Sequence, residues 1–233
     1  MTSQPTIAAK TSVTQSTYEL LRDDLLSCRI RPGERLNIRE LSLRLSINAA
    51  ALREALSRLT ADGLVVAEPL KGFRSAPISA DDLTDLSKMR VEVENMCIRE
   101  SLAHGELAWE SQLIGAFHLL KRMDSSIGAD GSTSSEWREA HHAFHEAIVG
   151  ACTNSWMLKV RSMLFLQNSR YRNLSISLTN DTRDLEAEHL ALLEAALERD
   201  VDRTCSLMTQ HILATQHAVL LDLMSRGSEP SKR

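Results

Sequence analysis

The stretch from Asn37 to Leu59, NIRELSLRLSINAAALREALSRL, predicts two short helices separated by a tight turn. Asn37 is a residue type that caps helix N-termini, and Glu40 three positions later completes a capping box. Asn48 is a second N-cap candidate, which predicts a second helix over 49–61. Apolar residues recur along that helix at positions i, i+3, i+4 and i+7, which gives one buried stripe made of Leu52, Ala55, Leu56 and Leu59.

The faces of these two helices indicate what they do. The first is expected to bury Leu41 and Leu45, whereas Ala49, Arg53 and Ser57 of the second fall off its stripe and face outward. Two helices joined by a turn, with a polar outer face on the second, have the layout of a helix-turn-helix that can enter the DNA major groove. An ordinary helical hairpin is the alternative, because paired amphipathic helices are common.

The flanking segments favour the DNA-binding interpretation. A short β-type run over 64–67 is followed by a basic turn over 71–74, which together predict a small hairpin, the wing of a winged helix-turn-helix. A helical pattern over 16–27 precedes the motif, and Pro32-Gly33 marks a turn between them.

Several motifs in this region occur in the order found in the GntR family of bacterial transcription regulators. The segments are LSCRIRPGERL at 26–36, REL at 39–41, LREALSRL at 52–59 and GLV at 63–65. About residues 14–78 therefore resemble the DNA-binding half of that family.

The resemblance implies that Arg39 and Arg53 meet DNA and that the wing glycine Gly72, beside Lys71, enters the minor groove. Asn48 and Ala49 stand where the recognition helix begins, and Ala49 replaces an arginine that the family usually has there. Loss of such an arginine contact typically weakens base discrimination by about 1–3 kcal/mol. Cys28 replaces a glycine after the first helix, where we expect slight backbone strain.

The composition favours helices and an intracellular chain. Aromatic residues make up 4% of the 233 residues, whereas leucine and alanine are abundant. No apolar run is long enough for a membrane span, and the N-terminus lacks the pattern of a signal peptide. The four scattered cysteines form no paired motif, so we expect reduced thiols in a cytoplasmic protein.

Charge separates two parts of the chain. Up to residue 78 there are 11 Lys and Arg against 8 Asp and Glu, and beyond it 16 against 23, so net charges of +3 and −7 make up the total of −4. A basic first part on an acidic second part fits a DNA reader joined to a part that need not touch DNA.

The sequence therefore predicts a mainly α fold with three segments. Residues 1–13 are expected to be a disordered tail, 14–78 the winged helix-turn-helix, and 79–228 an all-helical bundle for effector binding and dimerisation. Helices are expected at 82–104, 107–123, 136–151, 156–178, 181–199 and 201–226. In the first of them, the expected buried stripe consists of Leu83, Leu86, Met89, Val93 and Met96.

Four histidines in the second part lie on apolar helix faces. His141 and His145 are four residues apart and share one face, and His189 and His211 lie on the stripes of two later helices. Neutral imidazole is a common ligand for zinc and also suits nickel, copper and iron. The alternative is that they are hydrogen-bonded core residues without a metal.

Residues 83–225 resemble the FCD effector domain of the FadR-like branch of the GntR family. The motifs are AFHEAI at 143–148 with Asn154, and Glu188-His189 through to His211. Many members hold a divalent metal through an Asp and three His, and His141 stands here at the Asp position. This exchange favours zinc or nickel over manganese or magnesium, or it leaves His141 outside the ligand set.

The same resemblance suggests an effector site. Arg90 lies where the family has an arginine that binds the effector's carboxylate, although with Glu94 it could equally form a surface ion pair. Asn168 and Arg172 are further candidates for the pocket.

We therefore expect a homodimeric, non-enzymatic transcription regulator that binds a palindromic DNA operator and responds to a small carboxylate at the metal site. One alternative is a metal-dependent enzyme, since a metal with open positions can activate water. Against it, no motif places a general base or a nucleophile. Another alternative is a regulator that senses the metal itself.

Overall fold

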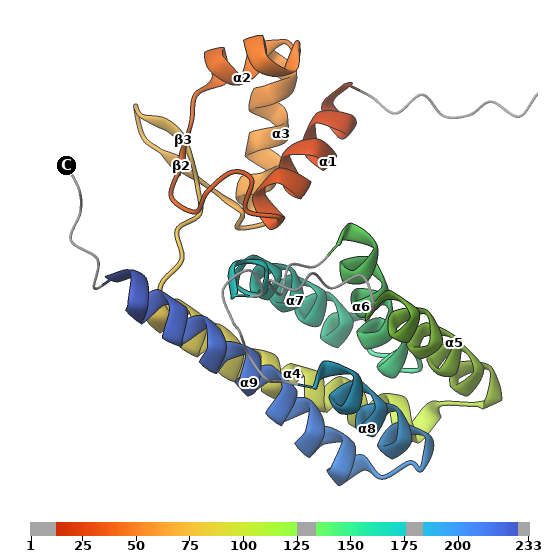
Figure 1. Cartoon of the computed structure of the whole chain (residues 1–233). Helices are drawn as coiled ribbons and strands as arrows, with labels where there is room; N and C mark the ends of the chain where they lie inside the picture. The colour runs from red at the N-terminus through yellow and green to blue at the C-terminus, as the bar shows by residue number, and fades with distance from the viewer. Residues whose placement is uncertain (1–12, 125–133, 176–183, 228–233) are drawn as a thin grey trace, which may run out of the picture. The chain divides into compact units, whose positions relative to one another are not determined.

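The computed structural model describes residues 13–124, 134–175 and 184–227, and it divides the chain after Ile78 into two compact units. Figure 1 shows the N-terminal unit in red to yellow and the C-terminal unit in yellow-green to blue. The boundary agrees with the predicted division at 78/79, and each unit has its own core. The predicted tail, except Val13, lies outside the described residues.

The N-terminal unit contains three helices, α1 (Val13–Leu26), α2 (Ile38–Leu45) and α3 (Ala49–Ala61). Asn37 caps α2 by accepting hydrogen bonds from the backbone N–H groups of Arg39 and Glu40, and Asn48 caps α3 in the same way through Ala51. Both predicted caps are therefore confirmed.

The predicted stripe of α3 is the centre of this core. Leu52, Ala55, Leu56 and Leu59 have no exposed surface, and α1 and α2 pack against this helix. On α2 only Leu41 is buried, whereas Leu45 is half-exposed. The prediction of a buried side chain is therefore correct for Leu41 and wrong for Leu45.

The wing is a β-hairpin of β2 (Val65–Glu68) and β3 (Gly72–Ser75), as the sequence predicts. A third strand, β1 (Arg35–Leu36), pairs with the other edge of β3 and gives the antiparallel order β1-β3-β2. This strand follows the Pro32-Gly33 turn and was not expected, because two residues are too short to show a period. Cys28 has a φ of +57°, which confirms the expected backbone strain.

In the C-terminal unit, all described regular structure is helical. The helices are α4 (Ala80–His104), α5 (Leu107–Asp124), α6 (Ser135–Ile148), α7 (Ser155–Ser175), α8 (Leu185–Leu197) and α9 (Val201–Gly227). α4 and α9 lie side by side, α7 packs against both, and α5 packs against α6 and α8 (Figure 1). The six predicted helices are present, while the ends expected at 178 and 181 lie outside the described residues.

The predicted stripe of α4 is partly wrong. Leu83 and Val93 are buried, but Met89 and Met96 are 53% and 51% exposed. The buried face instead includes Ser87, Arg90, Glu94, Cys97, Ile98, Ser101 and Leu102. Because this face borders a polar interior, hydrophobicity alone does not identify which side of α4 points inward.

All four cysteines are free thiols; Cys97, Cys152 and Cys205 are buried and Cys28 is half-buried. Within the described parts of the chain, none of the helices combines the length and the apolar character that crossing a membrane requires.

Candidate metal centre and nucleic-acid interface

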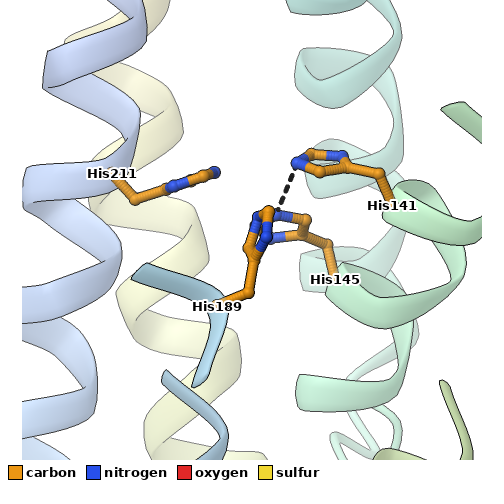
Figure 2. Close-up of side chains that lie close together, drawn as sticks. All are labelled: His141, His145, His189 and His211. Carbon is orange, nitrogen blue, oxygen red and sulfur yellow. Dashed lines mark hydrogen bonds between the residues drawn. The ribbon is translucent and has the colours of Figure 1, made fainter. Parts of the chain in front are cut away.

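The four histidines singled out from the sequence converge inside the helical unit. His141 and His145 project from α6, His189 from α8 and His211 from α9, and Figure 2 shows their rings gathered around one point. One ring nitrogen from each lies within 4.8 Å of the others. Their exposed fractions are 6% or less, so bulk water does not reach this cluster.

The spacing of these nitrogens is compatible with a shared metal ion. The Nε2 atoms of His141 and His145 are 3.2 Å apart (Figure 2). Zn–N bonds of about 2.1 Å place tetrahedral ligand nitrogens roughly 3.4 Å from one another. The ligand nitrogens of all four residues lie within 4.8 Å of one another, so the four residues fit a nitrogen-rich metal site.

The electrostatic environment keeps the rings of α6 neutral. Burial holds the pKa values of His141 and His145 well below the ordinary value, and the neighbouring histidines and arginines lower them further. A neutral imidazole has a lone pair to donate, whereas a protonated one repels a cation. His141 and His145 are therefore uncharged at neutral pH and do not repel a metal cation.

Hydrogen bonds outside the cluster orient two of the rings differently. Nδ1 of His211 lies 2.7 Å from Oε2 of Glu188, an arrangement that leaves Nε2 as the ligand atom, as in carboxylate–histidine–metal sites. Arg172 donates to Nδ1 of His141 at 2.8 Å, so in a neutral ring Nε2 carries the proton. His211 is thus preset for metal, whereas His141 must change its partner or protonation to ligate.

A buried ionic network fixes the helix that carries His145. Arg161 of α7 donates to Glu94 of α4 at 3.0 Å, to the backbone carbonyl of His145 at 2.8 Å, and to Glu146. Burial disfavours the Arg161 guanidinium, but Glu94 and Glu146 outweigh this and raise its pKa. Glu94 therefore pairs with Arg161, and the alternative of a surface ion pair between Arg90 and Glu94 is wrong because both residues are buried.

Two more buried arginines border the cluster. The guanidinium groups of Arg90 and Arg172 lie 5.1 and 5.7 Å from the centre of the Phe165 ring. Burial lowers the pKa of Arg90 to about 10 and that of Arg172 to about 9, so both remain charged at neutral pH. Asn168 on the same helix as Arg172 is also buried. All three predicted effector residues therefore lie in the interior of this unit.

Unpartnered polar atoms accompany these charges. Among the described residues, Nε of Arg90, Oε2 of Glu94 and Nδ1 of His145 are buried without a hydrogen-bond partner. Such atoms are rare in folded proteins and costly unless a ligand, ion or water satisfies them. The charge of Arg90 also contributes to the lowered pKa of His145, after burial and the neighbouring histidines.

The candidate DNA-contacting residues all lie in the N-terminal unit. Arg39 on α2, Arg53 on α3 and Lys71 on the wing are exposed, and within the described part of the chain their side chains make no hydrogen bond or ion pair. Asn48 and Gly72 are also exposed, and Ala49 is half-buried. By contrast, Arg58 of α3 lies 4.2 Å from the ring of Tyr18 and bonds Gln15, which gives it a structural role.

Sequence reasoning missed the residues that support the site. Glu188, Arg161 and Glu146 act through partners on other helices, which no spacing along one helix can reveal. Trp137 was also missed, and its ring stacks on His141 at 4.8 Å. A charged residue inside an apolar helical stretch, such as Arg161, was the one available signal. The four remaining histidines, 104, 118, 142 and 217, are exposed.

Comparison with known proteins agrees with this division into two units. Residues 13–74 match the family described as bacterial regulatory proteins, gntR family, and residues 85–214 match the FCD domain. The first match covers the winged unit and the second covers more than half of the chain, including all four buried histidines.

Relatives span both units. The chain is 35% identical over 207 residues to the uncharacterized HTH-type transcriptional regulator BphR of Paraburkholderia xenovorans, covering 88% of this chain and 84% of the relative. It is 34% identical over 203 residues to the HTH-type transcriptional repressor GlaR of Escherichia coli, covering 84% and 90% of the two chains.

Solved structures share the fold. McbR/YncC of E. coli superposes with a TM-score of 0.74 at 16% identity, covering 92% of this chain and all of that one. A putative GntR regulator from Rhodococcus sp. RHA1 superposes at 0.71 and 19% identity, covering 93% and 99%. From the winged unit, the helical unit and these relatives together, the chain belongs to the GntR family, FadR-like branch, as a DNA-binding transcription regulator with an FCD domain.

Proposed function

We propose that this regulator holds a divalent metal at the four-histidine cluster and that a small carboxylate bound beside the metal changes its affinity for a DNA operator. The single observation that carries the proposal is the set of four buried imidazoles with ligand nitrogens within 4.8 Å of one another. Nδ1 of His145 is buried without a hydrogen-bond partner, and burying such a polar atom is costly unless a ligand or ion compensates it.

The donor set supports zinc or nickel as the metal. Four imidazole nitrogens supply no negative charge and no oxygen, whereas manganese and magnesium prefer carboxylate, carbonyl and water oxygens. Glu188 behind His211 adds the carboxylate partner that raises the basicity of a ligating imidazole. A metal held by these residues would supply a Lewis-acidic position for an anionic effector if the effector were added as a further ligand or replaced one imidazole.

Positive charge beside the cluster supports a carboxylate as the effector. Arg90 and Arg172 remain protonated, and a guanidinium matches a carboxylate with two parallel hydrogen bonds. Arg161 is already neutralised by Glu94 and Glu146, so it does not compete for the effector. Two protonated guanidinium groups beside the cluster favour an acid that carries two carboxylates, which we place in the C4–C6 range.

The regulator acts on DNA as a homodimer in the cytoplasm, with two recognition helices on a palindromic operator. Arg39, Arg53, Lys71 and Gly72 contact DNA, and Asn48 and Ala49 form the start of the recognition helix. The names of two relatives, GlaR and RspR of E. coli, describe repressors, which supports repression as the mode of control. Effector control requires that the carboxylate bind the DNA-competent and DNA-incompetent states with different affinities.

Two other functions are less well supported. An enzyme would need a general base beside the metal, whereas Glu188, which contacts the cluster, is engaged by His211. A sensor of the metal itself would need weak, exchangeable binding, whereas burial and four ligands favour tight binding.

Metal analysis of the purified protein tests the site. We expect about one zinc or nickel per chain in the unmodified protein and less than a tenth of that after His145→Ala together with His189→Ala. The matched control is His118→Ala with His104→Ala, which removes two exposed histidines and is expected to leave the metal content unchanged. Full metal occupancy in the His145/His189 variant would contradict the site.

A further inference from the structure

The tip of the wing has an unusual residue at its most constrained position. The turn between β2 and β3 is closed by a hydrogen bond from the backbone N–H of Lys71 to the carbonyl of Glu68, with Pro69 second and Leu70 third. Leu70 has a φ of +63°. Proline at the second position and a positive φ at the third are the features of a type II turn, whose third position normally holds glycine or asparagine.

Leucine at this position has a conformational cost and no packing benefit inside the protein. Its side chain is as exposed as in a free peptide, at 108% of the reference surface, which is the largest value among the exposed apolar residues of the described chain. A left-handed backbone brings Cβ of any non-glycine residue close to the following carbonyl oxygen. Neither local conformation nor the core therefore accounts for Leu70, and strain of this kind accumulates at functional sites.

The surroundings of Leu70 are positively charged. Lys71 is its exposed neighbour, and Arg35 of β1 donates from Nη2 to the carbonyl of Lys71 at 3.2 Å. This bond holds a guanidinium at the base of the turn, so two cations flank the exposed leucine. A narrow minor groove attracts such cations through its enhanced negative potential.

We propose that Leu70 is an apolar wedge that enters the DNA minor groove, partly unstacks a base step and bends the operator. Proteins that bend DNA through the minor groove use apolar side chains, leucine among them, in this way. Lys71 and Arg35 contact the phosphates on either side, while the rigid Pro69 turn keeps the leucine projected. The proposal concerns how the wing meets DNA and does not depend on the metal or the effector.

A substitution at Leu70 can separate this role from a structural one. Asparagine tolerates the left-handed conformation better than leucine, so Leu70→Asn relieves strain while removing the apolar side chain. A purely structural leucine would show unchanged DNA bending in this variant. If Leu70 is a wedge, the Leu70→Asn protein is expected to have an equal or higher thermal midpoint of unfolding and to bend DNA less.

The test uses a duplex that the unmodified full-length protein selects from a random-sequence library. The bend is measured by fluorescence energy transfer between dyes at the duplex ends, and unstacking by 2-aminopurine placed at successive steps. We expect Leu70→Asn to lose most of the bend and the 2-aminopurine signal and to raise the dissociation constant by about tenfold, given the value of burying a leucine side chain. Leu70→Met, which keeps an apolar side chain, is expected to retain the bend.

Leu107→Asn is the matched control, because Leu107 is also a highly exposed leucine but lies on α5 of the helical unit. It is expected to bend and bind DNA like the unmodified protein. An unchanged bend in Leu70→Asn would overturn the proposal, as would a change in oligomeric state by sedimentation, which would assign Leu70 to a protein contact. Selection of no duplex by the unmodified protein would instead contradict DNA reading as a whole, and the wedge with it.

Discussion

At the scale of single residues, the hydrogen bond from Arg172 to His141 decides how the cluster is prepared for metal. Arg172 can only donate, so Nδ1 of His141 must accept, and the proton of the neutral ring lies on Nε2. That proton faces Nε2 of His145 at 3.2 Å. Metal loading through Nε2 of His141 would therefore require Arg172 to leave Nδ1, which would free a guanidinium for the carboxylate.

Replacing His141 with aspartate tests this position. In His141→Asp the site gains an anionic oxygen ligand. Arg172 can donate to the same carboxylate, which carries no ring proton that would have to move before the residue binds metal. We expect the affinity for Mn²⁺ to rise by at least about tenfold, with the preference for Zn²⁺ over Mn²⁺ reduced. Isothermal titration calorimetry on the metal-stripped protein measures both affinities.

The exposed His118→Asp is the control for the added charge and is expected to leave both affinities unchanged. An unaltered Mn²⁺ affinity in His141→Asp would mean that residue 141 does not face the metal.

The buried pair of Arg161 and Glu94 gives a second prediction at this scale. Arg161→Met leaves the Glu94 carboxylate buried without a counter-charge, which is expected to destabilise the helical unit by about 3–5 kcal/mol. The three tryptophans, 109, 137 and 156, all lie in this unit, so their fluorescence during urea unfolding reports on it alone.

Arg99→Met is the matched control, because Arg99 forms an exposed pair with Asp202. Such pairs contribute about 0–1 kcal/mol. Adding Glu94→Gln to Arg161→Met is expected to restore part of the lost stability, since the uncompensated charge is removed. Equal losses in the Arg161 and Arg99 variants would contradict the assigned role of the buried pair.

At the scale of helices and strands, the caps and stripes of the winged unit follow from sequence, whereas the interior of the helical unit does not. Asn37 and Asn48 act through neighbours two or three residues away, so local pattern suffices to identify them. The inward face of α4 contains Arg90 and Glu94 and leaves Met89 exposed. A helix that borders a buried polar site violates the hydrophobic pattern on which the prediction of its face depends.

The cap of α3 also offers a test of the recognition helix. Asn48→Asp keeps an N-capping side chain and adds a negative charge at a helix N-terminus, so the thermal midpoint is expected to stay equal or rise slightly. The same carboxylate would face DNA phosphates, and we expect operator affinity to fall by roughly tenfold at low salt. Fluorescence anisotropy with a selected duplex measures the affinity.

Ser134→Asp provides the comparison, because Ser134 caps α6 in the helical unit by the same chemistry. It is expected to leave DNA affinity unchanged. If Asn48→Asp bound DNA as tightly as the unmodified protein, the start of α3 would not lie against the phosphate backbone.

At the scale of the whole molecule, a winged unit of net charge +3 is joined to a helical unit of net charge −7. The motifs and the charge division predict these two units from sequence. The apolar helix faces and the resemblance to the FCD domain predict that His141, His145, His189 and His211 come together. The sequence could not predict that Arg161 rather than Arg90 pairs with Glu94, because that contact joins α4 to α7 across 67 residues. Contacts between helices depend on packing, which no single helix encodes.

The central claim is that a carboxylate bound at the histidine site controls the DNA affinity of the winged unit. The most direct measurement is the dissociation constant of the metal-loaded protein for its selected duplex, with and without each member of a series of C4–C6 diacids. We predict that at least one diacid changes this constant by tenfold or more, within the usual range of allosteric coupling of about 5–150-fold. We also predict that the change disappears in the His145→Ala and His189→Ala variant. The same change in both proteins would contradict the account.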